Sequence, residues 1–225
     1  MNKIAVIADI HSNLKALNKA IETLEKEKVD KVFVCGDVVG YGKNPNECCN
    51  IIRKLRWPVV AGNHDWAVAG KTEYEDSHSE TAVRGINETK RIITPGNLTW
   101  LKSLKPHHVK DEMEFVHSSL VDSEKWYYLT LGSTFKGSVW QDVRDNFDVM
   151  KGQVCFVGHT HIPVIFLEIT PKNIKVISPD RDFYELEGKR AIINVGSIGQ
   201  PRTSSKKASL VIYDRETQKI RVIRF

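Results

Sequence analysis

The sequence predicts an α/β fold, a four-layer α-β-β-α sandwich of two mixed sheets, and two patterns along the chain carry this prediction. In the N-terminal third, short apolar runs alternate with segments whose apolar residues recur at helical spacing. After Pro163 the pattern is mostly β, with short apolar strands separated by turn-rich segments. Alternating strands and helices gather functional groups at the carboxyl ends of the strands. The later strands are expected to form a second sheet packed on the first, with helices outside.

The predicted elements begin with a strand at residues 3–8. Apolar residues from Leu14 to Leu24 mark the helix after it, with Ser12 or Asn13 as the N-cap. The remaining elements, in chain order, are a strand at 32–35, a helix at about 45–55, a strand at 59–61, helices at 80–93 and 97–104, a strand at 114–117, a helix through 139–147, and strands at 154–157, 164–167, 174–177, 191–195, 209–213 and 220–223.

A chain of 225 residues has the length of one large α/β domain, so we expect residues 1–225 to form a single domain. Between about 66 and 110 the strand pattern stops and the sequence becomes polar and helical. This segment is interpreted as an insertion, either a partial lid over a site or a peripheral helical addition. His107 and His108, near its end, are expected in an exposed loop.

The composition, 41% hydrophobic and 27% charged, is that of a folded globular protein and excludes disordered and fibrous classes. No apolar run approaches the roughly 20 residues that a membrane span requires, and the N-terminus enters a strand directly, so we predict a cytoplasmic protein. The four cysteines lack zinc-site spacing and are predicted to be reduced thiols. The net charge of +5 is dispersed, which gives no strong indication of nucleic-acid binding. Whether the chain forms a homo-oligomer stays open.

Metal-binding residue types follow five predicted strands. These residues are Asp9 and His11, Asp37, Asn63 and His64, His117, and His159 with His161. Each alone has a structural explanation, because Asp and Asn favour turns. Their joint occurrence after what we take to be five consecutive parallel strands predicts a common site, because ligands of α/β proteins bind at the carboxyl ends of the strands.

The number of candidate ligands indicates more than one metal ion. A single tetrahedral zinc takes at most four protein groups, whereas eight candidate groups are present here. Mixed oxygen and nitrogen donors suit manganese, iron, zinc or nickel. Two ions that share a bridging carboxylate, about 3.5 to 4 Å apart, bind both the attacking and the leaving oxygens of a displacement at phosphorus.

These residues resemble the five ordered motifs of the calcineurin-like metallophosphoesterases over residues 4 to 163. The motifs are Asp9-Ile10-His11, Gly36-Asp37, Gly62-Asn63-His64-Asp65, His117 and Gly158-His159-Thr160-His161. Residues 194–202 and 37–47 are similar to segments of the small bacterial and archaeal predicted phosphodiesterases of that superfamily.

The resemblance implies the metallophosphoesterase fold and a phosphoester hydrolase that uses two divalent cations. Manganese is the first choice, and iron, nickel and zinc are alternatives. One ion would be bound by Asp9, His11 and His161, the other by Asn63, His117 and His159, and Asp37 would bridge them. His64 would contact the phosphoryl oxygen or protonate the leaving group, while a hydroxide bridging the two metals attacks phosphorus in line.

The sequence departs from part of the wider family after the bridging aspartate. Protein phosphatases and symmetrical diadenosine tetraphosphate hydrolases have an Asp-x-x-Asp-Arg-Gly pattern there, whose second acid pairs with the catalytic histidine. Gly40 and Tyr41 occupy the positions of that acid and of the arginine. Which acid orients His64, whether Asp65 or another or none, is left open. The departure favours a small-molecule phosphodiesterase over phosphoprotein or diadenosine substrates.

Two alternatives to a phosphodiesterase remain at this point. One is a hydrolase of nucleotides or dinucleoside polyphosphates, and the other is a catalytically silent metal-binding scaffold for a protein partner. Arg202 is a candidate contact to substrate phosphate, with a solvated turn as its alternative interpretation.

Overall fold

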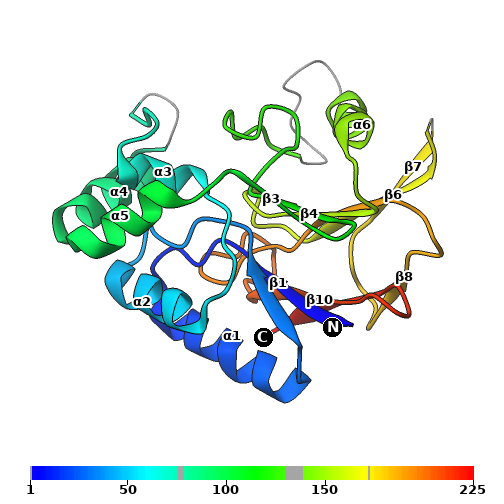
Figure 1. Ribbon diagram of the computed structural model, residues 1–225, viewed down its shortest axis with the longest axis horizontal. Helices are drawn as coiled ribbons and strands as arrows, with labels where there is room; N and C mark the ends of the chain where they lie inside the picture. The colour runs from blue at the N-terminus through cyan, green and yellow to red at the C-terminus, as the bar shows by residue number, and fades with distance from the viewer. Residues whose placement is uncertain (1, 76–78, 130–138, 172) are drawn as a thin grey trace.

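The computed structural model describes residues 2–75, 79–129, 139–171 and 173–225, and two mixed sheets form the centre of this part of the chain (Figure 1). In spatial order, the first sheet consists of β2 (Lys31–Val34), β1 (Lys3–Ile7), β10 (Ser209–Asp214), β11 (Lys219–Arg224) and β8 (Tyr184–Glu185). The second consists of β3 (His107–Lys110), β4 (Met113–Val116), β5 (Val154–Val157), β9 (Ala191–Asn194), β6 (Val164–Thr170) and β7 (Asn173–Ile177).

Side chains that alternate along the strands fill the space between the two sheets. In β1, Ile4 and Val6 belong to the apolar cluster between the sheets, whereas Ala5 and Ile7 face the opposite side. The ring of Phe33 in β2 stacks on Phe115 in β4, with 4.1 Å between the ring centroids. The period of two in the sequence therefore places one face of each strand in the central core.

Helices cover both outer faces. The helices are α1 (Leu14–Glu27), α2 (Pro45–Leu55), α3 (Asn63–Ala69), α4 (Glu80–Ile92), α5 (Pro95–Ser103) and α6 (Val139–Val149). Leu17 of α1 and Ile52 of α2 pack against the outer face of the first sheet, and Val143 and Phe147 of α6 pack against the second. Figure 1 shows α1 and α6 on opposite sides of the two sheets. The predicted four-layer α-β-β-α sandwich is confirmed.

Two local predictions differ from the structure, and one helix was not predicted. Residues 59–61 were expected to form a strand but make only isolated parallel bridges, from Val59 to Val34 and from Val60 to Lys105, before α3 begins. Helix α3 itself was not predicted. His107 and His108 lie in edge strand β3 and not in a loop, because β3 pairs along its whole length with β4.

The expectation of five consecutive parallel strands is wrong. Strands β1 and β2 run parallel in the first sheet, whereas β4, β5 and β9 run parallel in the second. The candidate ligands therefore come from both sheets and meet where the carboxyl ends of the two parallel sets lie together.

The segment at about 66–110, which the sequence analysis interprets as an insertion, contains most of α3 together with α4, α5 and β3, the first strand of the second sheet. Residues 76–78 of this segment lie outside the described residues, and its role as an insertion stays a prediction. Helices α3, α4 and α5 lie together at one end of the molecule (Figure 1). The four cysteines are free and buried. Among the helices described, none is long and apolar enough to cross a bilayer.

Candidate metal centre

The candidate ligands lie in the turns that follow β1, β2, β4 and β5 and at the start of α3. All seven are at least 95% buried: Asp9, His11, Asp37, Asn63, His117, His159 and His161. Five of them, all except Asn63 and His117, have positive φ angles between 50° and 67°. Residues other than glycine seldom adopt this conformation, and it is concentrated at functional sites. The positive φ angles of these turns therefore indicate a functional site.

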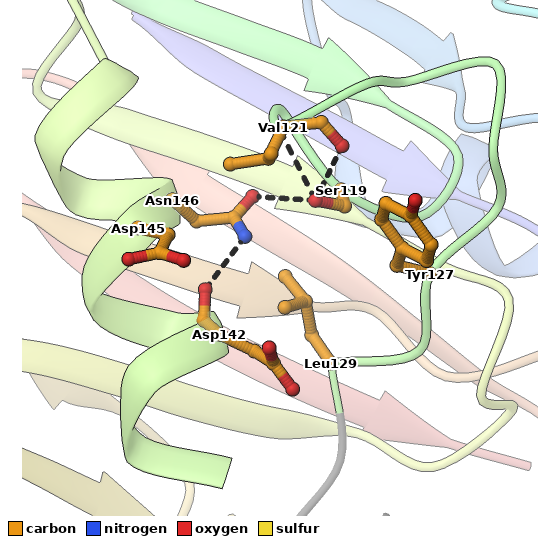
Figure 2. A pocket seen from close by; sticks show the side chains of 7 residues that line it. All are labelled: Ser119, Val121, Tyr127, Leu129, Asp142, Asp145 and Asn146. Carbon is orange, nitrogen blue, oxygen red and sulfur yellow. Dashed lines mark hydrogen bonds between the residues drawn. The ribbon is translucent and has the colours of Figure 1, made fainter. Parts of the chain in front are cut away.

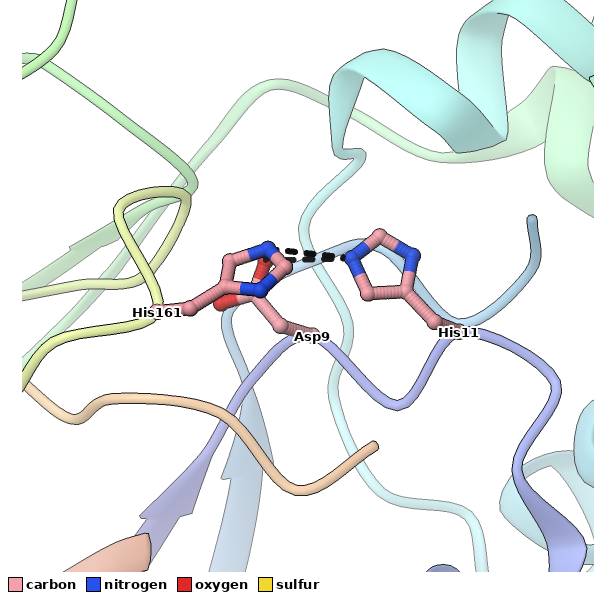
Figure 3. A group of neighbouring side chains, drawn as sticks. All are labelled: Asp9, His11 and His161. Atoms are coloured by element: carbon pink, nitrogen blue, oxygen red, sulfur yellow. Dashed lines mark hydrogen bonds and ion pairs between the residues drawn. The ribbon is translucent and has the colours of Figure 1, made fainter. Parts of the chain in front are cut away.

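One group of ligand atoms consists of Asp9, His11 and His161 (Figure 3). His161 Nε2 lies 3.2 Å from Asp9 Oδ1 and 3.1 Å from His11 Nε2. His11 Nε2 lies 3.7 Å from the same Asp9 oxygen. Three atoms that could each donate a lone pair to a cation therefore converge on one point, from the ends of β1 and β5.

A second group consists of Asp37, His117 and His159. His117 Nε2 lies 3.3 Å from Asp37 Oδ2, 3.2 Å from His159 Nδ1 and 3.0 Å from Asn63 Oδ1. Asp37 Oδ2 is also 3.6 Å from His11 Nε2 in the first group. The Asp37 carboxylate thus lies between the two groups.

The hydrogen bonds on the far side of the rings orient three of the histidines. Backbone carbonyls of Val39, Cys35 and Gln200 lie 3.2, 2.7 and 2.6 Å from the Nδ1 atoms of His11, His117 and His161. Because a carbonyl can only accept, each Nδ1 carries a proton, and Nε2 is the atom that points toward the ligand groups and binds a metal when the ring is neutral. This arrangement is typical of metal-binding histidines.

The polar atoms at the centre fit divalent cations. Among the described residues, Asp9 Oδ1 and Asp37 Oδ2 are buried and have no hydrogen-bond partner. Buried carboxylate oxygens are costly unless they are hydrogen-bonded or bind a metal. A donor set of carboxylate oxygens, imidazole nitrogens and one amide oxygen suits the transition metals manganese, iron, zinc and nickel.

The pKa values of the histidines reflect this environment. Burial lowers the pKa of His11 and of His159 well below the usual value, so both are neutral near pH 7 and able to bind a metal. Burial acts in the same direction on His117, but the carboxylate of Asp37 outweighs it and raises the His117 pKa to about 9. Without a metal, His117 and Asp37 therefore form an ion pair.

His64 lies at the border of both groups. Its ring belongs with His11 and Asp37 to a third set of close ligand atoms, and its backbone N–H donates to Asp37 Oδ1 at 2.9 Å. The next residue, Asp65, accepts backbone N–H groups of Val39 and Gly62 at 3.2 and 3.0 Å. Asp65 thus joins the turn after β2 to the start of α3.

A cleft of about 400 Å³ opens onto these groups. Its wall includes Arg202, as the sequence suggested, and Tyr41. It also includes residues that could not be predicted, because no local pattern distinguishes them: Ser79, Lys125, Trp126 and Tyr128. Arg202 is exposed, and its backbone N–H donates to the His161 carbonyl at 3.4 Å.

A smaller cavity of about 160 Å³ lies between α6 and residues 119–129 (Figure 2). Asn146 of α6 holds one wall by accepting the Ser119 hydroxyl and the Leu120 N–H at 3.1 and 2.7 Å. This cavity contains none of the candidate metal ligands.

Two sheets that bring carboxylates and imidazoles together at one edge define a metal-binding α/β sandwich. The chain matches the model of the calcineurin-like phosphoesterase superfamily domain over residues 2–218. It therefore belongs to the calcineurin-like phosphoesterase superfamily, and its buried His and Asp groups are those of a metallophosphoesterase.

Three proteins of similar length resemble this chain. The chain is 38% identical over 227 aligned positions to the uncharacterized protein MJ0912 of Methanocaldococcus jannaschii, covering 98% of this chain and 86% of that protein. It resembles the crystal structure of a metallophosphoesterase from Sphaerobacter thermophilus, with a TM-score of 0.82, 29% identity and coverage of 100% and 88%. The hypothetical protein PH1004 of Pyrococcus horikoshii has the same fold, with a TM-score of 0.76, 20% identity and the same coverage.

Proposed function

We propose that this protein is a phosphodiesterase that uses two divalent cations. The observation that carries the proposal is the position of Asp37, whose Oδ2 lies 3.3 Å from His117 in one ligand group and 3.6 Å from His11 in the other. In this proposal Asp9, His11 and His161 hold one ion, Asn63, His117 and His159 hold the other, and Asp37 bridges them. When bound, two such cations lower the pKa of water and offset the charge that develops on the phosphoryl oxygens.

The other residues bind the ester and move a proton. His64 donates a proton to the leaving oxygen as the bond between that oxygen and phosphorus breaks, which is general acid catalysis. Arg202, on the wall of the cleft, binds a phosphate oxygen of the substrate. Gly40, at a position where an acid would favour phosphoprotein or diadenosine substrates, supports a small phosphodiester as the substrate class.

One reconstitution experiment tests the proposal. Metal-free protein is loaded separately with manganese, nickel, zinc and magnesium and is assayed on bis(p-nitrophenyl) phosphate, p-nitrophenyl phosphate and diadenosine tetraphosphate. We expect fastest turnover of the diester, with manganese giving the highest activity. Preference for diadenosine tetraphosphate would replace the proposal with a dinucleoside polyphosphate hydrolase. A metal-loaded protein that hydrolyses none of the esters would indicate a silent scaffold.

A further inference from the structure

The imidazole of His64 is part of a cluster of three rings. The ring centroid of Tyr41 lies 4.7 Å from that of His64 and 4.7 Å from that of His11. The His11 and His64 centroids are 4.8 Å apart. Each ring thus contacts the other two, and any rotation of the His64 side chain changes its contact with Tyr41.

The main chain of Gly40 lies against the edge of the same imidazole. A β-carbon added at Gly40 would come within 2.4 Å of His64 Nδ1 and 3.0 Å of Cγ. Gly40 also has φ = +97°, a conformation that favours glycine. As long as His64 keeps this orientation, position 40 cannot hold a side chain. The next residue in the chain, Tyr41, provides the ring that contacts the imidazole.

Tyr41 is in turn held by the insertion. A β-carbon at Gly85, in the middle of α4, would lie 2.6 Å from the Tyr41 backbone nitrogen and 2.7 Å from its Cα. The backbone of α4 therefore packs directly on the backbone of Tyr41. Ala82, one turn earlier in α4, lines the same cleft as Tyr41 and His64. The contacts run from α4 through Tyr41 to His64.

We propose that Tyr41 is a positioning residue for His64. Its ring holds the imidazole in the orientation from which the His64 N–H reaches the leaving oxygen, and α4 fixes Tyr41 through the close contact at Gly85. Hydroxide derived from water forms the new bond to phosphorus as the bond to the leaving oxygen breaks. The proton passes from His64 to that oxygen, which departs as an alcohol, and neutral His64 regains a proton from water. This inference rests on the proposed function, in which His64 is the proton donor.

The test compares Tyr41→Ala with Tyr41→Phe on diesters whose leaving groups range from p-nitrophenol to a simple alcohol. An alkoxide requires a proton to leave, whereas p-nitrophenolate leaves without one. We expect Tyr41→Ala to reduce kcat roughly tenfold to a hundredfold for alkyl leaving groups. The kcat of Tyr41→Ala for the p-nitrophenyl ester falls far less. Its KM for these diesters stays at the wild-type value. In Tyr41→Phe, kcat depends on the leaving group as in the wild type, because this variant keeps the aromatic ring.

A variant that combines Tyr41→Ala with His64→Ala tests whether the two residues act together or independently. His64→Ala should show the same dependence on the leaving group as Tyr41→Ala. Adding Tyr41→Ala to His64→Ala should cause no further loss, because the ring then has no imidazole to orient. Metal content and melting temperature are measured for every variant, so that a loss of the metal ions or of the fold is recognised.

A spectroscopic measurement on the metal-free protein does not depend on activity. The carbon-bound ring protons of His64 are assigned by their absence in His64→Ala, and their NMR shifts report the neighbouring tyrosine ring. We expect these resonances to move in Tyr41→Ala and to stay in Tyr41→Phe. Unmoved resonances, or an equal loss of kcat for every leaving group, overturn the inference while leaving the phosphodiesterase proposal intact. A wild-type protein that hydrolyses no ester in the series overturns the proposed function, and with it this role of Tyr41.

Discussion

The backbone N–H of His64 donates a 2.9 Å hydrogen bond to Asp37 Oδ1. Because of this bond, the two oxygens of the Asp37 carboxylate have different partners. Oδ1 is held by the start of α3, whereas Oδ2 faces His117 at 3.3 Å and His11 at 3.6 Å. The proposed bridging ligand and the proposed proton donor are therefore fixed to each other through the main chain.

The substitution Asp37→Asn keeps the hydrogen bond from the His64 N–H but removes the negative charge of the proposed bridging ligand. The asparagine carbonyl can still accept the His64 N–H, and its volume is nearly unchanged, so we expect the fold to persist. The negative charge between the two ligand groups is lost, and we expect fewer than two bound metal ions and a fall in kcat/KM of more than about a hundredfold. Elemental analysis and diester kinetics check this. Activity within a few-fold of wild type would rule out Asp37 as the bridge, and Asp37→Ala should be equally inactive.

His159 and His161 should affect different metal ions. Although only Thr160 separates them, the His161 ring joins Asp9 and His11, whereas the His159 ring joins Asp37 and His117. We expect His159→Ala and His161→Ala each to bind one metal ion instead of two, with elemental analysis as the measurement. The retained ion should differ, which Mn²⁺ electron paramagnetic resonance can distinguish. Loss of both ions in each variant would instead indicate a single, indivisible site.

The sequence indicated which His and Asp side chains lie close together, because these residues come just after apolar runs and this relation is local. That they bind metal ions stays a prediction. The sequence did not predict that β1 and β4 belong to different sheets, since strand partners depend on contacts between distant segments. Helix α3 was missed for a different reason: all seven of its residues, from Asn63 to Ala69, are buried, so it shows no amphipathic period. The cleft residues Lys125 and Tyr128 carry no local pattern at all.

The stability of the metal-free protein should fall as the pH rises from about 7 to above 9. The folded-state pKa of His117 is raised to about 9, because Asp37 outweighs the effect of burial. Its usual value is about 6.5. Stability from this pair is therefore fully present below about pH 6.5 and is lost as the pH passes through 9. Thermal unfolding in a chelating buffer at a series of pH values measures the effect.

His117→Asn is the control for this pH dependence, because asparagine is polar but does not titrate. We expect a flatter dependence of the melting temperature on pH over the same interval. Binding of metal to wild type should also release a proton near pH 7.5, because His117 must be neutral to act as a ligand. A pH profile that is identical in wild type and His117→Asn would contradict the ion pair.

Two glycine substitutions in the insertion offer a matched comparison of packing on Tyr41. A β-carbon at Gly96 in α5 meets no atom closer than Arg53 Nη1 at 4.0 Å, whereas one at Gly85 in α4 lies 2.6 Å from the Tyr41 backbone nitrogen. Replacing a helical glycine by alanine stabilises by up to about 1 kcal/mol where space allows. We expect Gly96→Ala to be neutral or more stable than wild type in denaturant titrations.

Gly85→Ala gains the same helical preference but forces either α4 or Tyr41 to move. We expect a lower melting temperature, together with the selective loss on alkyl leaving groups that is expected of Tyr41→Ala. Because both substitutions add one methyl group to a helix of the same insertion, a difference between them reports the contact with Tyr41. If Gly85→Ala matched Gly96→Ala in both stability and leaving-group dependence, α4 would have no part in holding the residues around His64.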